Sequence, residues 1–189
     1  MSNAIETVQP AFEFRVAGHS DVAALVGLVN RAYRPEQAAA GWTHEAHLVA
    51  GMRTNASQVE GLMAARGSVL LVGLRDDQLA ACVQVEANDG SSYIGMLAVE
   101  PALQAKGLGT QTLEFAERYA AQVQGASRLV MTVVSHRKEL VAFYLRHGYQ
   151  LTGRTEGFPS YAGKPKQPGL ELVELAKHVA QGWRTPLQT

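Results

Sequence analysis

The chain has 189 residues, and its composition excludes several classes of protein. Hydrophobic residues make up 47% of the chain and charged residues only 18%, which excludes a disordered acidic or basic protein. Its 17 Lys and Arg residues balance 17 Asp and Glu residues, so a general binder of nucleic acid or of anionic membranes is not expected. A chain of this length can bury a full core without disulfides, and we expect one compact domain.

The cysteine content and the two ends of the chain set further limits. Cys82 is the single cysteine, which allows no internal disulfide and no cysteine-based zinc site. We therefore expect a reducing, cytoplasmic setting. His44 and His47 have a spacing that can mimic metal ligands, but the sequence suggests no third ligand, so we expect no bound metal. The opening Ser2-Asn3-Ala4 is similar to an expression-tag remnant. We expect residues 1–10 to be such a remnant or disordered, residues 11–178 to form the domain, and residues 179–189 to be a tail.

The first third of the chain predicts one strand followed by helices. Residues 12–16 alternate as in a short strand, and Ser20 offers an N-cap for a helix that runs to Tyr33. Two shorter helices are then expected, the first from Trp42 to about Ala50. For the second, Ser57 and Glu60 have the spacing of a capping box, with an end near Arg66.

The rest of the chain predicts strands interrupted by two helices. Three segments have strand periodicity and short turns between them, which indicates an antiparallel meander over residues 69–75, 79–86 and 93–99. Residues 107–122 and 128–134 follow as a helix and a buried strand, a β-α-β crossover. A helix over 138–147, ended by Gly148, and two closing strands over 149–154 and 169–176 complete an α/β fold with a mixed sheet.

The strongest functional pattern lies where a strand ends and the long helix begins. Gly107 and Gly109 open that helix, where free amide groups and the positive end of the helix dipole favour a phosphate. The expected ligand is a pyrophosphate. The segment lacks the lysine of a Walker A loop, and Thr112 stands in place of the third Rossmann glycine. The alternative is that the glycines only permit close packing of helix and sheet.

A second pattern follows one crossover later, in the helix that ends Phe143-Tyr144-Leu145-Arg146-His147-Gly148-Tyr149. With the segment from Leu97 to Thr110, it closely resembles the GNAT superfamily of acyl-CoA-dependent N-acetyltransferases. The resemblance is specific over about Tyr93 to Tyr149. It implies a mixed, mostly antiparallel central sheet of six to seven strands with helices on both faces, and acetyl-CoA as the acyl donor.

The resemblance also implies which residues bind the donor. The backbone of Leu97, Ala98 and Val99 would pair with pantetheine in a gap between two strands. The pyrophosphate would lie on the loop formed by Gln104, Ala105, Lys106, Gly107, Leu108, Gly109 and Thr110. Where many family members have an asparagine, seven residues before Tyr144, this chain has Arg137, for which we expect a contact to the phosphates of CoA.

Two residues are the candidates for proton transfer. The resemblance implies that the Tyr144 hydroxyl protonates the departing thiolate; the alternative is that Tyr144 only packs in the core. The attacking amine must lose a proton, and Glu86 is the first candidate for the base, with His136 as the second. A solvent-exposed structural role is the alternative for both. Cys82 falls inside a strand, where a buried thiol is usually inert, so direct transfer is favoured over an acyl-cysteine route.

These patterns predict an N-acetyltransferase that moves the acetyl group of acetyl-CoA to a primary amine of a small molecule or peptide. The alternative from another class is a catalytically silent CoA-binding sensor or interaction module, and the presence of Tyr144 favours the enzyme. A nucleotide-binding domain lacks its usual motifs here. The sequence does not identify the acceptor, and the oligomeric state stays open, with a homodimer among the options.

Overall fold

A computed structural model describes residues 12–35, 44–179 and 183 of the chain. The helices in this part are α1 (Val22–Tyr33), α2 (Ala56–Ala64), α3 (Leu108–Gln122) and α4 (Lys138–Arg146). The strands are β1 (Glu13–Val16), β2 (Val49–Ala50), β3 (Ser68–Arg75), β4 (Gln78–Asn88), β5 (Ser91–Val99), β6 (Arg128–Val134), β7 (Gln150–Gly157), β8 (Lys164–Pro165) and β9 (Glu171–His178). No helix within the described residues is long and apolar enough to cross a membrane.

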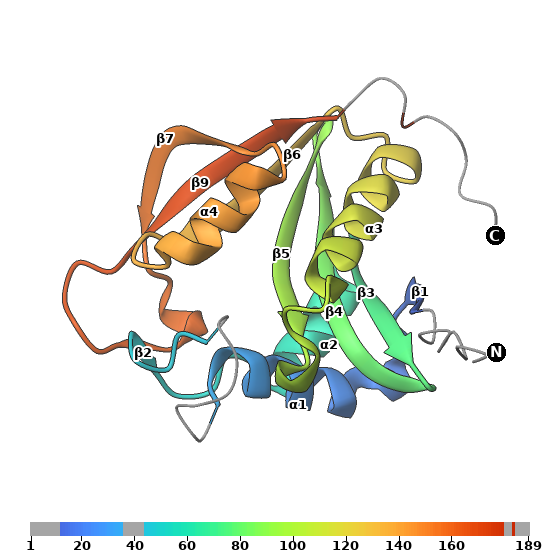
Figure 1. Cartoon of the computed structure of the whole chain (residues 1–189), viewed down its shortest axis with the longest axis horizontal. Coiled ribbons are helices and arrows are strands. Elements are labelled where there is room, and N and C mark those ends of the chain that lie inside the picture. The colour runs from blue at the N-terminus through green and yellow to red at the C-terminus, as the bar shows by residue number, and fades with distance from the viewer. Residues whose placement is uncertain (1–11, 36–43, 180–182, 184–189) are drawn as a thin grey trace, which may run out of the picture.

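Seven of these strands form one twisted sheet in the order β1-β3-β4-β5-β6-β9-β7 (Figure 1). All neighbours are antiparallel except β5 and β6, which are parallel because the α3 crossover joins them. The short strands β2 and β8 pair separately. The predicted mixed, mostly antiparallel sheet is therefore confirmed, with seven strands.

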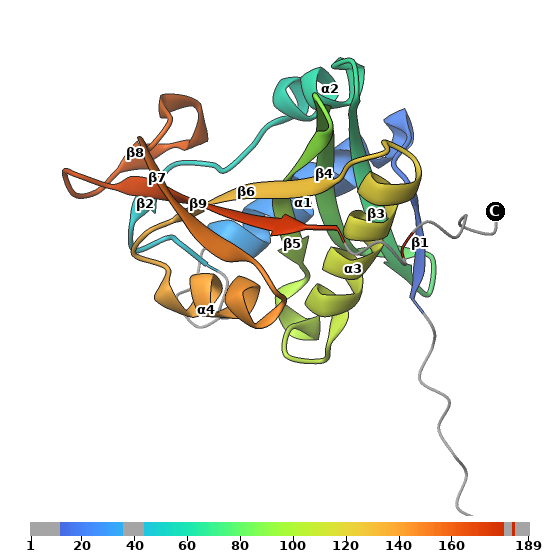
Figure 2. The same cartoon turned by 90° about the horizontal axis from the view of Figure 1, so that it is seen from above.

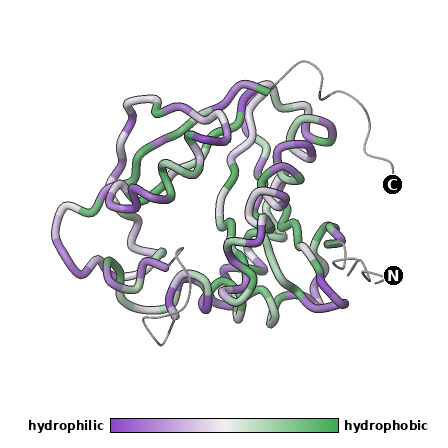
Figure 3. The backbone as a smooth tube through the Cα atoms, in the orientation of Figure 1, coloured by the Kyte–Doolittle hydropathy of each residue, from purple (hydrophilic) through white to green (hydrophobic). Residues whose placement is uncertain are grey.

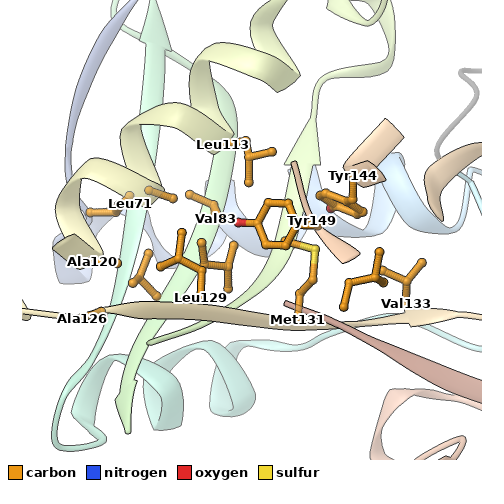
Figure 4. Close-up of a cluster of buried hydrophobic side chains, with 14 residues drawn as sticks. Leu71, Val83, Leu113, Ala120, Ala126, Leu129, Met131, Val133, Tyr144 and Tyr149 are labelled. Carbon is orange, nitrogen blue, oxygen red and sulfur yellow. The ribbon is translucent and has the colours of Figure 1, made fainter. Parts of the chain in front are cut away.

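Helices cover both faces of the sheet, as predicted (Figure 2). Alternate residues along β3 point to opposite faces, because side chains in a strand alternate with a period of two. Leu71 packs with α3 and α4, whereas Leu70 and Val72 pack with α1 and α2. Figure 4 shows the first of these two clusters, and Figure 3 shows that hydrophobic residues gather in the central strands while β7 is mostly hydrophilic or neutral.

Strands β5 and β6 pair only over their first three residues. Backbone pairing runs from Ser91 to Tyr93, after which the two strands diverge (Figure 1). On its other side, β5 pairs with β4 through a bulge, in which two residues, Met96 and Leu97, lie opposite the single residue Val83. Met96 has a positive φ of 48°, an uncommon conformation for this residue type. The bulge and the divergence leave the end of β5 without a strand neighbour toward β6.

Three details of the helix predictions are wrong. The N-cap of α1 is Asp21, at the end of a short 3-10 turn that contains the predicted cap Ser20. Residues 44–50 form a turn and the two-residue strand β2 in place of the end of a helix; Trp42 and Thr43 lie outside the described residues. Pairing of β2 with β8 supplies backbone partners that the local sequence does not reveal. The N-cap of α2 is Asn55, which forms the capping box with Gln58, two residues before the predicted pair.

Candidate active site

The loop before α3 presents backbone amides at the end of β5. Gly107 is the N-cap of α3, with φ 81°, and no side chain caps the helix. A Cβ on Gly107 would have no heavy atom within 4 Å, so the glycine is not required by close packing. It allows the left-handed backbone conformation and leaves space for a ligand to approach the amides. The side chain of Leu108 is buried, so this residue offers only its backbone to a ligand. Uncapped amides at the start of a 15-residue helix fit the predicted phosphate position.

Hydrogen bonds hold this loop in place. Gln104 Nε2 donates to the carbonyl of Val99 at 3.1 Å, which ties the loop to the end of β5. Thr110 Oγ1 lies 3.2 Å from His147 Nε2, which joins the start of α3 to the end of α4. His147 Nδ1 lies 2.8 Å from the carbonyl oxygen of Phe143 and must donate to it, because a carbonyl oxygen can only accept.

A mostly apolar groove leads from this loop along β5. We call it the glycine-loop groove; it is lined by Tyr33, Leu97, Val99, Gln104, Ala105, Gly109, Leu140 and Phe143. The hydroxyl of Tyr33 donates to the carbonyl of Leu97 at 3.0 Å, at the bulge. A carbonyl oxygen has two lone pairs, so Leu97 can accept a second hydrogen bond. The groove thus fits an extended chain that carries amide groups, with a phosphate end at α3.

The groove adjoins a central cavity between the diverging strands, and Tyr33, Leu97 and Leu140 line both. Tyr144 lines this cavity and is only 6% exposed. Its ring packs against Phe143 and Tyr149, at the opposite end of the buried cluster from Ala120 (Figure 4). Burial raises the pKa of Tyr144 above its usual range, so its hydroxyl stays protonated at neutral pH. A protonated hydroxyl is the form that a general acid requires.

Two ion pairs, each with at least one buried partner, lie at the central cavity. Arg137, 2% exposed, is the N-cap residue of α4 and pairs with Glu139. It lines the central cavity and not the glycine-loop groove, so a contact to the inner part of a cofactor fits better than one to a phosphate. Arg34 pairs with Glu45, and its Nη2 donates to the carbonyl of Ala162 at 3.0 Å. This pair joins the end of α1 to the loop between β7 and β8.

An outer cavity of about 510 Å³ adjoins the central one on the side of α2. Five side chains line both cavities: Arg53, Tyr93, Met96, Thr132 and Tyr161. The hydroxyls of Tyr93 and Thr132 lie 3.1 Å apart and connect β5 to β6 where the strands separate. Glu86 lines the outer cavity, half-buried, and accepts a hydrogen bond from Gln84 Nε2 at 3.0 Å. The volume falls within the range of small-molecule sites, roughly 300–1,000 Å³.

The structure brings most of the predicted site residues together. Parts of the glycine loop and of the end of β5, together with Tyr144 and Arg137, line two adjoining cavities, and Glu86 lines the outer cavity next to them. His136 is exposed and lines none of these cavities. Cys82 is fully buried, and burial raises its pKa to about 12. The described residues contain no group of three or more His, Cys, Asp or Glu that could hold a metal ion.

Several lining residues were not identified from the sequence. They include Glu45, Arg53, Thr132, Glu156 and Tyr161, which come from separate elements of the fold. Each is a single polar or aromatic residue in a loop or strand, with no motif around it. Arg53 follows the misassigned segment before α2, and Glu156 lies on β7, whose eight residues are all exposed. Only the tertiary fold brings these side chains to one place.

Comparison with protein families gives one match over most of the sheet. The model of the acetyltransferase (GNAT) family matches residues 28–149, which include the second half of α1, the glycine loop and Tyr144. The comparison with curated proteins found no match.

Solved structures resemble this chain over nearly its whole length. The ribosomal-protein-S18-alanine N-acetyltransferase from Escherichia coli is 13% identical, with a TM-score of 0.68 over 90% of this chain and 96% of that one. A putative acetyltransferase from Salmonella typhimurium, solved with its cofactor acetyl-CoA, is 19% identical, with a TM-score of 0.66 over 90% and 95%. A putative GNAT acetyltransferase from Desulfovibrio desulfuricans is 23% identical, with a TM-score of 0.65 over 90% and 100%. At these identities the likeness shows a shared fold.

Proposed function

The chain belongs to the acetyltransferase (GNAT) family, and from that premise we propose that it transfers the acetyl group of acetyl-CoA directly to a primary amine of a small molecule or peptide. The observation that carries the proposal is the row of adjoining cavities between the diverging strands, which share lining residues. It runs from the uncapped start of α3, past Tyr144, to a cavity that contains a carboxylate. A donor and an acceptor can therefore enter from opposite sides and meet at the central cavity.

The residues at the donor end bind and orient acetyl-CoA. Amides of the first turn of α3 hold the pyrophosphate, and Lys106, which is exposed on the same loop, adds positive charge. The end of β5, released from β6, offers backbone groups to the pantetheine amides. The bound donor supplies an acetyl thioester. Side chains of Ala98 and Val99 are buried in the core, so these two residues contribute only through their backbone.

Tyr144 and Glu86 move the protons. The amine nitrogen forms a bond to the acetyl carbonyl carbon, the carbon–sulfur bond breaks, and the sulfur leaves with both electrons of that bond. The Tyr144 hydroxyl donates its proton to the sulfur. It carries that proton at neutral pH because burial raises the pKa of Tyr144. Glu86 takes the proton of the amine through water, because it borders the outer cavity while Tyr144 lines the central one. Burial of Cys82 supports direct transfer without an acyl-cysteine.

Thiol release tests the proposal. The protein is incubated with acetyl-CoA and a panel of amines that covers amino acids, peptides, aminoglycosides and polyamines, while the effect of acetyl-CoA on the melting temperature is recorded separately. We expect a raised melting temperature and amine-dependent thiol release. A raised melting temperature without thiol release from any amine would favour a silent CoA-binding module. No change in melting temperature at millimolar acetyl-CoA would contradict donor binding itself.

A further inference from the structure

Arg53 occupies the boundary between the central and outer cavities, and its backbone is fixed from α1. The side chain of Asn30 makes three hydrogen bonds to the segment before α2. Its Oδ1 accepts from the amides of Arg53 at 2.6 Å and of Thr54 at 3.3 Å, and its Nδ2 donates to the carbonyl of Thr54 at 2.9 Å. These hydrogen bonds therefore fix the backbone position from which the Arg53 side chain extends along the cavity wall.

The guanidinium of Arg53 has no carboxylate partner within the described part of the chain. It lies over the ring of Tyr33, 5.3 Å from the centroid. By contrast, Arg137, the other arginine of the central cavity, pairs with Glu139, and Arg34 behind the cavity wall pairs with Glu45. A half-buried guanidinium that faces a cavity without a counter-ion offers its paired donors to an anionic ligand group.

The outer cavity is also lined by two carboxylates, and neither of them is paired with Arg53. Glu86 accepts from Gln84, and Glu156 belongs to the exposed strand β7. Neither carboxylate forms an ion pair with Arg53 among the described residues. Separated charges of both signs in one cavity fit a zwitterion, whereas a polyamine would leave the guanidinium repelled and unpaired.

We propose that Arg53 binds a carboxylate of the acceptor, and that the acceptor is a small amino acid in which the carboxylate lies close to the acetylated amine. This inference rests on the proposed acetyl transfer. Arg53 lines the central cavity together with Tyr144, so a carboxylate on Arg53 places a neighbouring amino group in the cavity where transfer occurs. The rest of the acceptor then extends into the outer cavity, toward Glu86.

Matched acceptors test this assignment. L-Methionine, L-phenylalanine and L-arginine are each compared with the corresponding amide and the corresponding decarboxylated amine, at saturating acetyl-CoA. The amino group of the amino-acid amide is less basic than the amino group of the free amino acid, whereas the amino group of the decarboxylated amine is not less basic. The two comparisons therefore separate recognition of the carboxylate charge from the intrinsic reactivity of the amine. We expect the wild-type protein to prefer the free amino acid in kcat/KM over both analogues for at least one of the three side chains.

The variants identify Arg53 as the source of the preference. Arg53→Gln should lower kcat/KM for the amino acid by about 10- to 100-fold, the range for a lost charge-assisted hydrogen bond, and leave the analogues nearly unchanged. Arg53→Lys should restore part of the loss. Arg66→Gln is the matched control, because Arg66 is exposed and lines none of the three cavities. The stabilisation by acetyl-CoA should be the same in all four proteins.

Two outcomes would overturn the inference while acetyl transfer stands. In one, the wild-type protein uses the amides and amines as well as the amino acids. In the other, Arg53→Gln lowers kcat/KM equally for amino acids and analogues, as a purely structural role would. A third outcome would overturn the proposed function and this inference with it. In that outcome acetyl-CoA stabilises the protein, but neither the nine compounds nor any amine of the broader panel is acetylated.

Discussion

The glycine-loop groove and the outer cavity adjoin the same central cavity but are built from different parts of the chain. The groove is formed mainly by two neighbouring segments, the end of β5 and the loop that begins α3, and it offers backbone groups. The outer cavity collects side chains from the loop before α2, from β4 and from β7. A backbone site tolerates changes of side chain, whereas a site made of side chains changes with each substitution. One fold can therefore keep its donor while it varies its acceptor.

Gly107→Asp should have the largest effect on the groove. It places a side chain on a left-handed residue and negative charge at the proposed pyrophosphate position, so the stabilisation by acetyl-CoA in a thermal melt should vanish. Gly125→Asp is the matched control, since Gly125 has φ 69°, is equally free of neighbours and lies at the other end of α3. Equal loss in both variants would mean that backbone strain alone explains the result.

Tyr144→Phe tests the point where the two regions meet. We expect kcat to fall by about 10²–10⁴-fold, the usual contribution of a general acid, with little change in the affinity for CoA. Tyr149→Phe is the control, because Tyr149 is buried in the same cluster but lines none of the three cavities. A wild-type kcat in folded Tyr144→Phe would show that the thiolate leaves without this proton.

The pH dependence of the wild-type protein offers a check on the same residue. Burial raises the pKa of Tyr144 above its usual value near 10, so the hydroxyl remains protonated through the alkaline range. The rate should therefore rise with pH as the amine loses its proton, and it should not fall again near pH 10 from ionisation of Tyr144. A fall near pH 10 that disappears in Tyr144→Phe would contradict the raised pKa.

Glu86→Gln tests the acceptor side and should have a smaller effect than Tyr144→Phe. We expect a slower rate at neutral pH, by about 10²-fold at most, and a steeper rise of the rate with pH, because without the base only amine that is already deprotonated in solution can react. Acetyl-CoA should stabilise the variant as it stabilises the wild type, because the groove is untouched. Glu114→Gln, an exposed residue of α3, is the control. An unchanged pH–rate profile would leave the proton to bulk solvent.

Cys82→Ala should have the smallest effect, since Cys82 belongs to neither region. Its thiol is fully buried beneath the β5 bulge, 3.8 Å from the carbonyl of Met96, and burial raises its pKa to about 12. We expect an unchanged kcat and a loss of roughly 1 kcal/mol in the free energy of unfolding. Loss of activity in a folded variant, together with acetyl label on Cys82 in the wild type, would establish a covalent route.

Most of the fold was predictable because its signals are local. Strand alternation in β3, β4 and β5 and the glycines that open α3 lie within short windows of sequence. The same holds for Gly148, which ends α4 with φ 86°. The segment before α2 was mispredicted because β2 exists only through its pairing with β8, more than a hundred residues later.

The sequence by itself determined the donor end of the candidate site, since a phosphate position made of backbone amides requires only a strand end, a glycine and a helix start in succession. The tertiary structure alone decided the acceptor end. Arg53, Glu86 and Glu156 meet only after the bulge in β5 and its early separation from β6 have opened a space between the strands. The charge of that cavity depends on side chains that long-range packing brings together. A local sequence pattern cannot predict which distant residues will line the same cavity.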